Sequence, residues 1–344
     1  MIDTTDRSEK TVAILEGTEL NGASQKINRQ FAADVYAGLT ADEKYLSSKY
    51  LYNKRGDEIF QQIMQMEEYY PTRAEYEIFE MHCQPMLEYF AKEQLPFRLI
   101  EFGAGDGTKT KVLLRHFLGQ KANFSYVPID ISANIIRELT ADLAENMPGL
   151  TVQGIQDDYF RAIDQLKASF DGTQVRNVVL FLGANIGNFS HPESIAFLKE
   201  IAAHLSPGDL LMTGFDLKKE PERILNAYFD KKGITRNFKH NLLLRINEEL
   251  GADFDIDSFQ YFPIYDPMEG SIRSYLVSKK DQQVTIPAIE EVIQFEAWEA
   301  IYMERSQKYS LGDIEGLAKK SGFSVVHHFY DSQKLFTDSL WQLL

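Results

Sequence analysis

The heptapeptide Glu101-Phe102-Gly103-Ala104-Gly105-Asp106-Gly107 decides the fold. The residues just before it, Phe97-Arg98-Leu99-Ile100, predict a strand, and the segment after it, Thr108–Leu118, has the apolar spacing of a helix. Glycines let the backbone turn tightly and let a ligand approach without Cβ contacts, and the start of a helix offers free N–H groups. The stretch therefore predicts a strand-turn-helix unit that binds a nucleotide-like ligand.

Strand and helix patterns alternate on both sides of this turn. The strands are predicted at Phe97–Glu101, Phe124–Asp130, Leu150–Ile155, Val175–Leu182 and Gly208–Phe215. The helices are predicted at Thr108–Leu118, Ser132–Glu145, Tyr159–Ala168 and His191–His204. This alternation favours an α/β fold with a parallel, doubly wound sheet.

The regular alternation ends after Asp216. Beyond it, helices are predicted at Pro221–Lys231, Asn237–Leu250 and Leu311–Ser321, and strands at Phe259–Tyr265, Ser271–Ser278, Glu291–Glu299, Phe323–Tyr330 and Ser339–Leu344. Ahead of the sheet, Asp57–Ile63 has helix spacing, and Thr72 with Glu75 predicts a capping box at a second helix start. The layout predicts a sheet domain over 76–216 and 309–344. An inserted α+β domain is predicted over 31–75 and 217–308, after a polar lead-in at 1–30.

Composition excludes several classes of function. The 344 residues suggest about two domains at roughly 150 residues each. A net charge of −15 repels phosphate backbones and anionic lipids, so neither nucleic acid nor a membrane is an expected partner. The single cysteine, Cys83, favours a reducing cytoplasm, and the seven histidines form no H-x-x-x-H pair, so no metal is expected. We expect a cytoplasmic monomer.

The glycine turn has two competing interpretations. A nicotinamide-binding turn needs G-x-G-x-x-G/A, but Thr108 occupies the last of these positions. The pattern Glu-x-Gly-x-Gly-x-Gly instead resembles the first motif of class I methyltransferases, which implies S-adenosylmethionine as cofactor. Asp130, at the end of the second predicted strand, can accept both ribose hydroxyls. The cluster at 157–159 can hold adenine, with a carboxylate for the amine and an aromatic ring for the base. The predicted terminal strand pair also favours a methyltransferase.

Four further segments resemble one family, the histidine Nα-methyltransferases of ergothioneine biosynthesis. They are Leu51-Tyr52-Asn53-Lys54-Arg55-Gly56, Glu68-Tyr69-Tyr70-Pro71-Thr72-Arg73-Ala74-Glu75, Phe181-Leu182-Gly183-Ala184-Asn185-Ile186-Gly187-Asn188, and Gly251-Ala252-Asp253-Phe254-Asp255. The similarity runs from about residue 31 to the C-terminus. Tyr-Tyr-Pro-Thr-Arg and Leu-Gly-x-x-Ile-Gly-Asn are quite specific to this family. The resemblance implies repeated methylation of the histidine α-amino group, giving the trimethylated betaine.

The resemblance also implies a role for individual residues. The cofactor would be held by Gly103, Gly105, Lys109, Asp130, Asp158 and Tyr159. The carboxylate and α-amino group of the amino acid would be held by Asn188, Tyr52 and Tyr228, of which Asn188 and Tyr52 are the catalytic candidates. Tyr69 would line the same site. Glu304 and Ser306 would hydrogen-bond the imidazole, whose one donor and one acceptor match a carboxylate and a hydroxyl.

Two departures from the family leave the acceptor open. Ser274 stands where the family has methionine, which implies a wider or more polar site for the side chain of the substrate. The glycine pattern at 103–107 also differs from the usual one, but it remains compatible with the cofactor. The acceptor is therefore expected to be histidine, with another amino acid or a ring nitrogen of histidine as alternatives. Two competing classes of function are a nicotinamide oxidoreductase and a non-catalytic S-adenosylmethionine sensor.

Overall fold

The computed structural model describes residues 28–92, 95–157, 160–162, 164 and 175–344, and their contacts form two compact units. Unit 1 contains the described residues up to Tyr69 together with Glu220–Ser306. Unit 2 contains Tyr70–Lys219 and Gln307–Leu344. No helix among the described residues is long and apolar enough to cross a membrane.

Unit 2 is built on one eight-stranded sheet. Its strands are β1 (Phe97–Phe102), β2 (Phe124–Asp130), β3 (Thr151–Val152), β4 (Ile155–Gln156), β5 (Arg176–Phe181), β6 (Leu210–Asp216), β12 (Phe323–Tyr330) and β13 (Phe336–Leu343). The order is β12-β13-β6-β5-β1-β2-β3, with β4 also pairing with β2. The pairs from β6 to β3 are parallel, whereas β13 is antiparallel to both β6 and β12. This confirms the doubly wound sheet with a closing strand pair.

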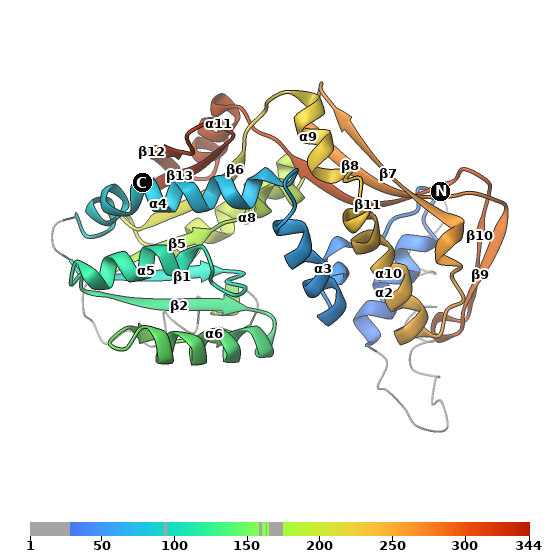
Figure 1. Cartoon of the computed structure of the whole chain (residues 1–344), viewed down its shortest axis with the longest axis horizontal. Coiled ribbons are helices and arrows are strands. Elements are labelled where there is room, and N and C mark those ends of the chain that lie inside the picture. Colours follow the sequence, from blue (N-terminus) through green and yellow to red (C-terminus); the bar gives the residue numbers. More distant parts are fainter. Residues whose placement is uncertain (1–27, 93–94, 158–159, 163, 165–174) are drawn as a thin grey trace. The chain divides into compact units, whose positions relative to one another are not determined.

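Helices cover both faces of this sheet. They are α4 (Tyr70–Phe90), α5 (Thr110–Gly119), α6 (Ala133–Asn146), η3 (Asn185–Asn188), α8 (His191–His204) and α11 (Leu311–Lys320). Apolar residues of α4, α5 and α6 form one core, and those of α8 and α11 form a second core. Figure 1 shows α4 and α5 side by side along the sheet.

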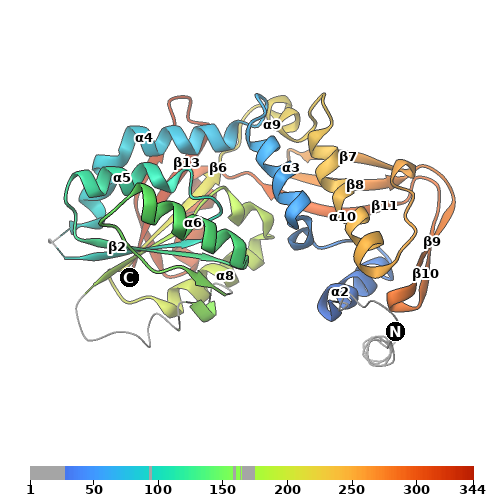
Figure 2. The ribbon, with the colours of Figure 1, turned by 60° about the horizontal axis from the view of Figure 1, so that its bottom comes forward.

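Unit 1 is an α+β unit with its own apolar core. Its helices are α2 (Arg29–Leu39), η1 (Ser48–Leu51), α3 (Lys54–Met64), α9 (Pro221–Tyr228), α10 (Ile234–Leu250), η4 (Ile256–Ser258) and η5 (Pro287–Ile289). Its strands are β7 (Phe259–Asp266), β8 (Ser271–Ser278), β9 (Gln282–Ile286), β10 (Glu291–Phe295) and β11 (Ala300–Gln307). Figure 2 shows β11, β8 and β7 side by side, and α10 contacts β7.

Three sequence predictions about elements were wrong. The predicted strand Leu150–Ile155 is interrupted and forms two short strands, β3 and β4. The predicted capping box at Thr72 does not start a helix, because α4 already begins at Tyr70 and the Glu75 side chain is fully buried inside the unit. The predicted strand at Glu291–Glu299 ends at Phe295, and β9 and β11 were not predicted. Most of the predicted helix Tyr159–Ala168 lies outside the described residues.

Candidate active site

The glycine loop after β1 has a backbone that favours glycine at three positions. Gly103, Gly105 and Gly107 have φ angles of 68°, 55° and 64°, which lie in the left-handed region. A Cβ on Gly107 would come within 2.8 Å of a terminal methyl group of Leu139 on α6, so a side chain at this position would have to displace Leu139. A Cβ on Gly105 would meet nothing within 4 Å. The backbone at Gly105 therefore borders open space that a ligand can occupy.

Asp130 lies beside this loop at the carboxyl end of β2. Its Oδ2 accepts a hydrogen bond from the Gly105 N–H at 3.3 Å, and its Oδ1 accepts one from the Ser132 N–H at 2.9 Å. Each carboxylate oxygen can accept a second hydrogen bond, so both remain capable of binding hydroxyl groups. The next residue, Ile131, is a large apolar side chain that is 80% exposed. Ile131 was not among the residues predicted from the sequence, and its exposure places an apolar surface directly after Asp130 in the sequence.

A buried carboxyl group connects β1, β2 and α5. Glu101 accepts hydrogen bonds from the hydroxyls of Thr110, at 2.7 Å, and Tyr126. Burial raises the pKa of Glu101 to about 7, although these two hydrogen bonds act in the opposite direction. The end of β1 is therefore hydrogen-bonded to α5 and β2 through the Glu101 carboxyl group, which gains or loses its proton near neutral pH.

Glu101→Gln is expected to change how stability depends on pH. The wild-type carboxyl titrates near 7 in the folded chain and near its ordinary 4.5 in the unfolded chain, so the folded state binds more protons between these values. Its contribution to the free energy of unfolding therefore decreases as pH rises, by ~2.5 kcal/mol from pH 5 to pH 8. Glutamine does not titrate, so urea denaturation of the variant should lack this decrease. Parallel pH curves for both proteins would contradict the assignment.

Lys109 and the loop after β5 both bind one buried glutamate. The Lys109 Nζ forms an ion pair with Glu75 Oε2, and the Gly183 N–H donates to Glu75 Oε1 at 2.7 Å. Burial alone would lower the pKa of Lys109, but the charge of Glu75 outweighs it and raises the pKa. Burial and the charge of Glu75 together raise the pKa of the neighbouring Asp338 well above its ordinary value. Glu75 thus connects α4, the glycine loop and the loop after β5.

The predicted residues of unit 2 lie at one edge of its sheet. Asn188 ends η3, just beyond β5, and is exposed, while Gly103 and Asp130 follow β1 and β2. Because β5, β1 and β2 are parallel neighbours, their carboxyl ends meet at this edge, where open α/β sheets bind ligands. Asp158 and Tyr159 lie outside the described residues.

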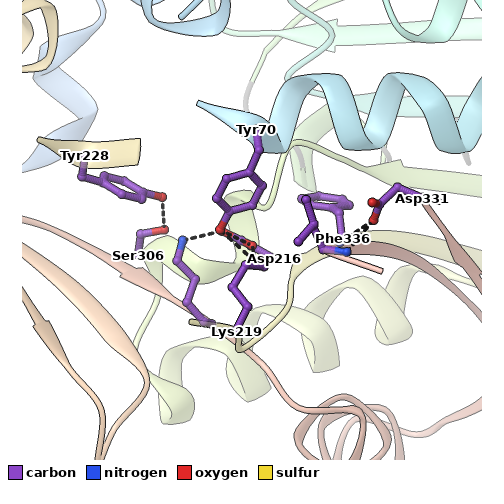
Figure 3. Close-up of polar contacts among 9 residues, drawn as sticks. Tyr70, Asp216, Lys219, Tyr228, Ser306, Asp331 and Phe336 are labelled. Atoms are coloured by element: carbon purple, nitrogen blue, oxygen red, sulfur yellow. Dashed lines mark hydrogen bonds and ion pairs between the residues drawn. The ribbon is translucent and has the colours of Figure 1, made fainter. Parts of the chain in front are cut away.

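A separate network surrounds Asp216 at the end of β6 (Figure 3). The Tyr70 hydroxyl lies 2.9 Å from both carboxylate oxygens, and the Lys308 Nζ lies 2.7 Å from Oδ2. The Lys219 Nζ contacts Oδ1 and donates to the Tyr70 hydroxyl at 2.8 Å. Burial alone would raise the pKa of Asp216, but the charges of Lys308 and Lys219 hold it below its ordinary value. Asp216 is therefore a carboxylate with two buried counter-charges.

Unit 1 brings three of the predicted tyrosines into one aromatic cluster. The ring of Tyr52 contacts those of Phe60 and Phe238, with centroids 5.5 Å and 5.4 Å apart. The Tyr69 ring contacts Phe60 at 6.5 Å and Tyr228 at 6.2 Å. The Tyr52 side chain keeps 42% exposure, yet the atoms crowded around it and the charge of Glu304 raise its pKa well above the ordinary value. The tyrosine hydroxyl is therefore protonated at neutral pH.

The polar residues predicted for the ring of the substrate lie in the same unit. The hydroxyls of Tyr228 and Ser306 are 2.8 Å apart (Figure 3), and Ser306 is buried. The Glu304 carboxylate, two residues before Ser306 on β11, has a side chain that is 12% exposed. Its Oε2 forms an ion pair with Lys239 of α10. Glu304 is therefore paired with a positive charge, Lys239, which the sequence prediction did not include.

Ser274 is buried on β8 and takes part in a hydrogen-bonded chain. The Tyr261 hydroxyl donates to the Tyr228 carbonyl at 2.9 Å and lies 3.2 Å from Ser274 Oγ. Because the single Tyr261 proton points to Tyr228, the serine hydroxyl must donate to Tyr261. Ser274 therefore supports the backbone that carries Tyr228. Tyr261 had no recognisable role in the sequence.

Sequence reasoning missed two charged residues that helix periodicity could have revealed. Lys239 precedes Leu242, Leu243 and Ile246 at the spacing of an apolar helix face, and Glu75 stands at the same spacing before Ile78 and Phe79. A charged residue in the apolar face of a helix is buried and needs an oppositely charged partner. Both side chains have one, Glu304 and Lys109 respectively.

A model of the histidine-specific, S-adenosylmethionine-dependent methyltransferases matches residues 31–343. The chain belongs to this family. A histidine N-alpha-methyltransferase of Mycolicibacterium smegmatis is 30% identical over 93% of this chain and 96% of its own length. A protein of the same name from Mycobacterium tuberculosis is 32% identical over 80% of this chain and 83% of its own. An L-tryptophan methyltransferase of Psilocybe serbica is 26% identical over 80% of this chain and 82% of its own.

Family membership defines the cofactor and the class of fold. The chain is an S-adenosylmethionine-dependent methyltransferase with a class I, Rossmann-like sheet, and its acceptor is a small molecule. The residues of unit 2 fit this cofactor, because the open backbone at Gly105 lies beside a carboxylate suited to ribose hydroxyls. The nicotinamide oxidoreductase is thereby excluded.

Proposed function

We propose that this enzyme transfers methyl groups from S-adenosylmethionine to the α-amino nitrogen of histidine, up to the trimethylated betaine. The observation that carries the proposal is the pair of Glu304 and Ser306 on β11, a carboxylate and a hydroxyl in one largely buried group. A neutral imidazole has one N–H donor and one nitrogen acceptor, which these two side chains can satisfy together. The names of the two mycobacterial relatives support the same acceptor and the same nitrogen.

We assign the remaining predicted residues either to the cofactor, which donates the methyl group, or to histidine, which accepts it. Gly103, Gly105 and Lys109 bind the cofactor near the glycine loop, Asp130 binds its ribose, and Asp158 with Tyr159 holds its adenine. Exposed Ile131 adds an apolar surface for the same base. Tyr52, Tyr228 and Asn188 hold the amino and carboxylate groups of histidine, with Asn188 and Tyr52 as catalytic residues, and Tyr69 lines their site. The domains predicted from the sequence, 76–216 with 309–344 and 31–75 with 217–308, keep their cofactor and substrate roles.

The chemistry requires little from the protein beyond binding and alignment. When bound, S-adenosylmethionine supplies a methyl group on an electrophilic sulfonium. The side chains must hold the α-amine in its neutral form, free of water, and in line with that group. A protonated tyrosine such as Tyr52 can orient the amine by hydrogen bonding without adding a negative charge that would favour the ammonium form.

Incubation with histidine and S-adenosylmethionine is expected to give mono-, di- and trimethylated histidine. The rate should rise with pH above about 8, because only the neutral α-amine is a nucleophile. Mass spectrometry of the products, with fragmentation to place each methyl group, provides the measurement. Absence of methylated histidine over a wide pH range would overturn the proposed function.

A different amino acid is the second candidate for the acceptor. Two observations support this candidate. The buried Ser274 stands where the family has methionine, and a related protein is an L-tryptophan methyltransferase. The same assay with a panel of amino acids decides it, because the preferred acceptor is the one with the highest kcat/KM. Fragmentation of the histidine product separates methylation of the α-amine from methylation of a ring nitrogen.

The proposal also includes where the enzyme acts and what it binds. We propose a cytoplasmic monomer that does not bind nucleic acid. The net charge of −15 and the single cysteine support this part of the proposal. Gel filtration against proteins of known mass tests the monomer.

A further inference from the structure

Lys239 is a buried cation in the middle of unit 1. Lys239 lies on α10 and is 1% exposed. Its neighbours on the same helix face are Leu242 and Leu243. An ammonium group is costly to bury without a partner, because it loses its hydration. The partner is Glu304, 65 residues further along the chain, whose Oε2 binds the Lys239 Nζ.

The other ionisable groups around Glu304 are neutral or engaged elsewhere. Tyr52 of the segment after η1, Tyr261 of β7 and Tyr302 of β11 are the tyrosines that sense its charge, and each has a raised pKa. The adjacent Arg305 forms its ion pair with Glu269. Among the described residues, Lys239 is therefore the cation that pairs with Glu304.

One carboxylate oxygen of Glu304 remains for a ligand. In the described part of the chain, the hydrogen bond to Glu304 reaches Oε2, and Oε1 can accept an N–H from a substrate. The pair of Lys239 and Glu304 has no net charge. A neutral imidazole can join it without adding charge to a largely buried group, whereas an imidazolium would be repelled by the nearby ammonium.

We infer that Lys239 is a positioning residue for the acceptor, which holds Glu304 as a carboxylate with one oxygen free and thereby selects the neutral form of the histidine ring. The inference rests on the proposed function. Lys239 acts through Glu304 and is not itself assigned a contact with the substrate. Without the ammonium, a protonated ring would supply the missing counter-charge, so the preference for the neutral ring would reverse.

The test compares histidine affinity in Lys239→Met and in the wild type as a function of pH. Calorimetric titration of L-histidine in the presence of S-adenosylhomocysteine gives the two Kd values. The titration of free histidine cancels in their ratio, because both proteins receive the same ligand. We expect the variant to bind about tenfold more weakly at pH 8.5, where the ring is neutral, and to approach the wild type near pH 6, where the ring is largely protonated.

Two further variants separate this role from a merely structural one. Lys239→Arg keeps the charge and is expected to keep the preference for the neutral ring. Lys44→Met removes another lysine of unit 1, which pairs with Glu299, and should give a ratio near one at every pH. A ratio for Lys239→Met that does not change with pH would overturn the inference, because a structural defect weakens binding at all pH values alike.

The wild type provides a measurement that does not depend on the folding of any variant. Its affinity for histidine should fall as pH drops below about 6.5, where the ring gains its proton. Tighter binding at low pH would overturn the role of Lys239 and leave histidine as the acceptor. No binding of histidine at any pH would overturn the proposed function, and the inference with it.

Discussion

Glu304→Ala is expected to lower the affinity for histidine by roughly 10- to 100-fold, the loss typical of a hydrogen bond to a charged group. The affinity for S-adenosylmethionine should not change, because the residues assigned to the cofactor lie in unit 2 and Glu304 lies in unit 1. Calorimetric titration with each ligand gives both values. An equal loss of affinity for the two ligands would contradict the assignment of Glu304 to the ring.

Two control variants make the Glu304 result specific. Glu304→Gln keeps a side-chain oxygen that accepts hydrogen bonds and should retain part of the affinity. Glu299→Ala removes a carboxylate of the same unit that pairs with Lys44, and histidine binding should be unchanged. Urea denaturation of each variant is also needed, because Glu304→Ala leaves Lys239 buried without its partner and should lower the stability.

Asp216→Asn is expected to cause the largest loss of stability, about 3–5 kcal/mol in the free energy of unfolding at pH 7. The substitution removes the negative charge that is paired with the fully buried side chain of Lys308 and the nearly buried side chain of Lys219. The wild-type contribution should itself depend on pH. Because the pKa of Asp216 is lowered in the folded chain, its stabilisation is present above its ordinary value of 3.8 and is lost as the pH falls below it.

Asp142→Asn is the matched control for the Asp216 variant. Asp142 also pairs with a lysine, Lys111, but its side chain is 41% exposed, and exposed ion pairs contribute at most about 1 kcal/mol. Urea denaturation of both variants at pH 7 gives the comparison. If Asp216→Asn lost no more stability than Asp142→Asn, the network around Asp216 would not be the stabilising feature proposed here.

The sequence allowed the sheet of unit 2 to be predicted well because its elements have simple periodic patterns. The predicted bounds of β2, α8 and β12 agree with the structure residue for residue. The two strands are rich in aromatic and β-branched residues, and an acidic residue stands at the end of β2 and directly after β12. Gly103 and Asp130 were each placed after a predicted strand, and the structure shows that these two strands are parallel neighbours whose ends meet at one edge.

In unit 1, β8 was also predicted residue for residue, but β11 was missed because charged and polar residues stand on its partly buried faces. β11 contains Glu304, Arg305 and Ser306 in succession, which masks the alternation typical of a strand. The ion pair of Glu304 with Lys239 joins residues 65 positions apart, and nothing in the local pattern links them. The wrong capping box has a similar cause, since Glu75 is bound by a lysine from another element and not by the backbone of its own helix.

The network around Asp216 bears on which parts of the chain can change in evolution without altering the sheet of unit 2. The chain passes between the units after Tyr69, after Lys219 and after Ser306. Tyr70, Lys219 and Lys308, which stand at or beside these three passages, all bind the same carboxylate. In unit 2, the residues that flank the segment 220–306 therefore meet at one buried carboxylate. Substitutions at Tyr228, Ser274, Glu304 or Ser306, which lie inside this segment and are proposed to bind the acceptor, leave this carboxylate and the strand register of unit 2 unchanged.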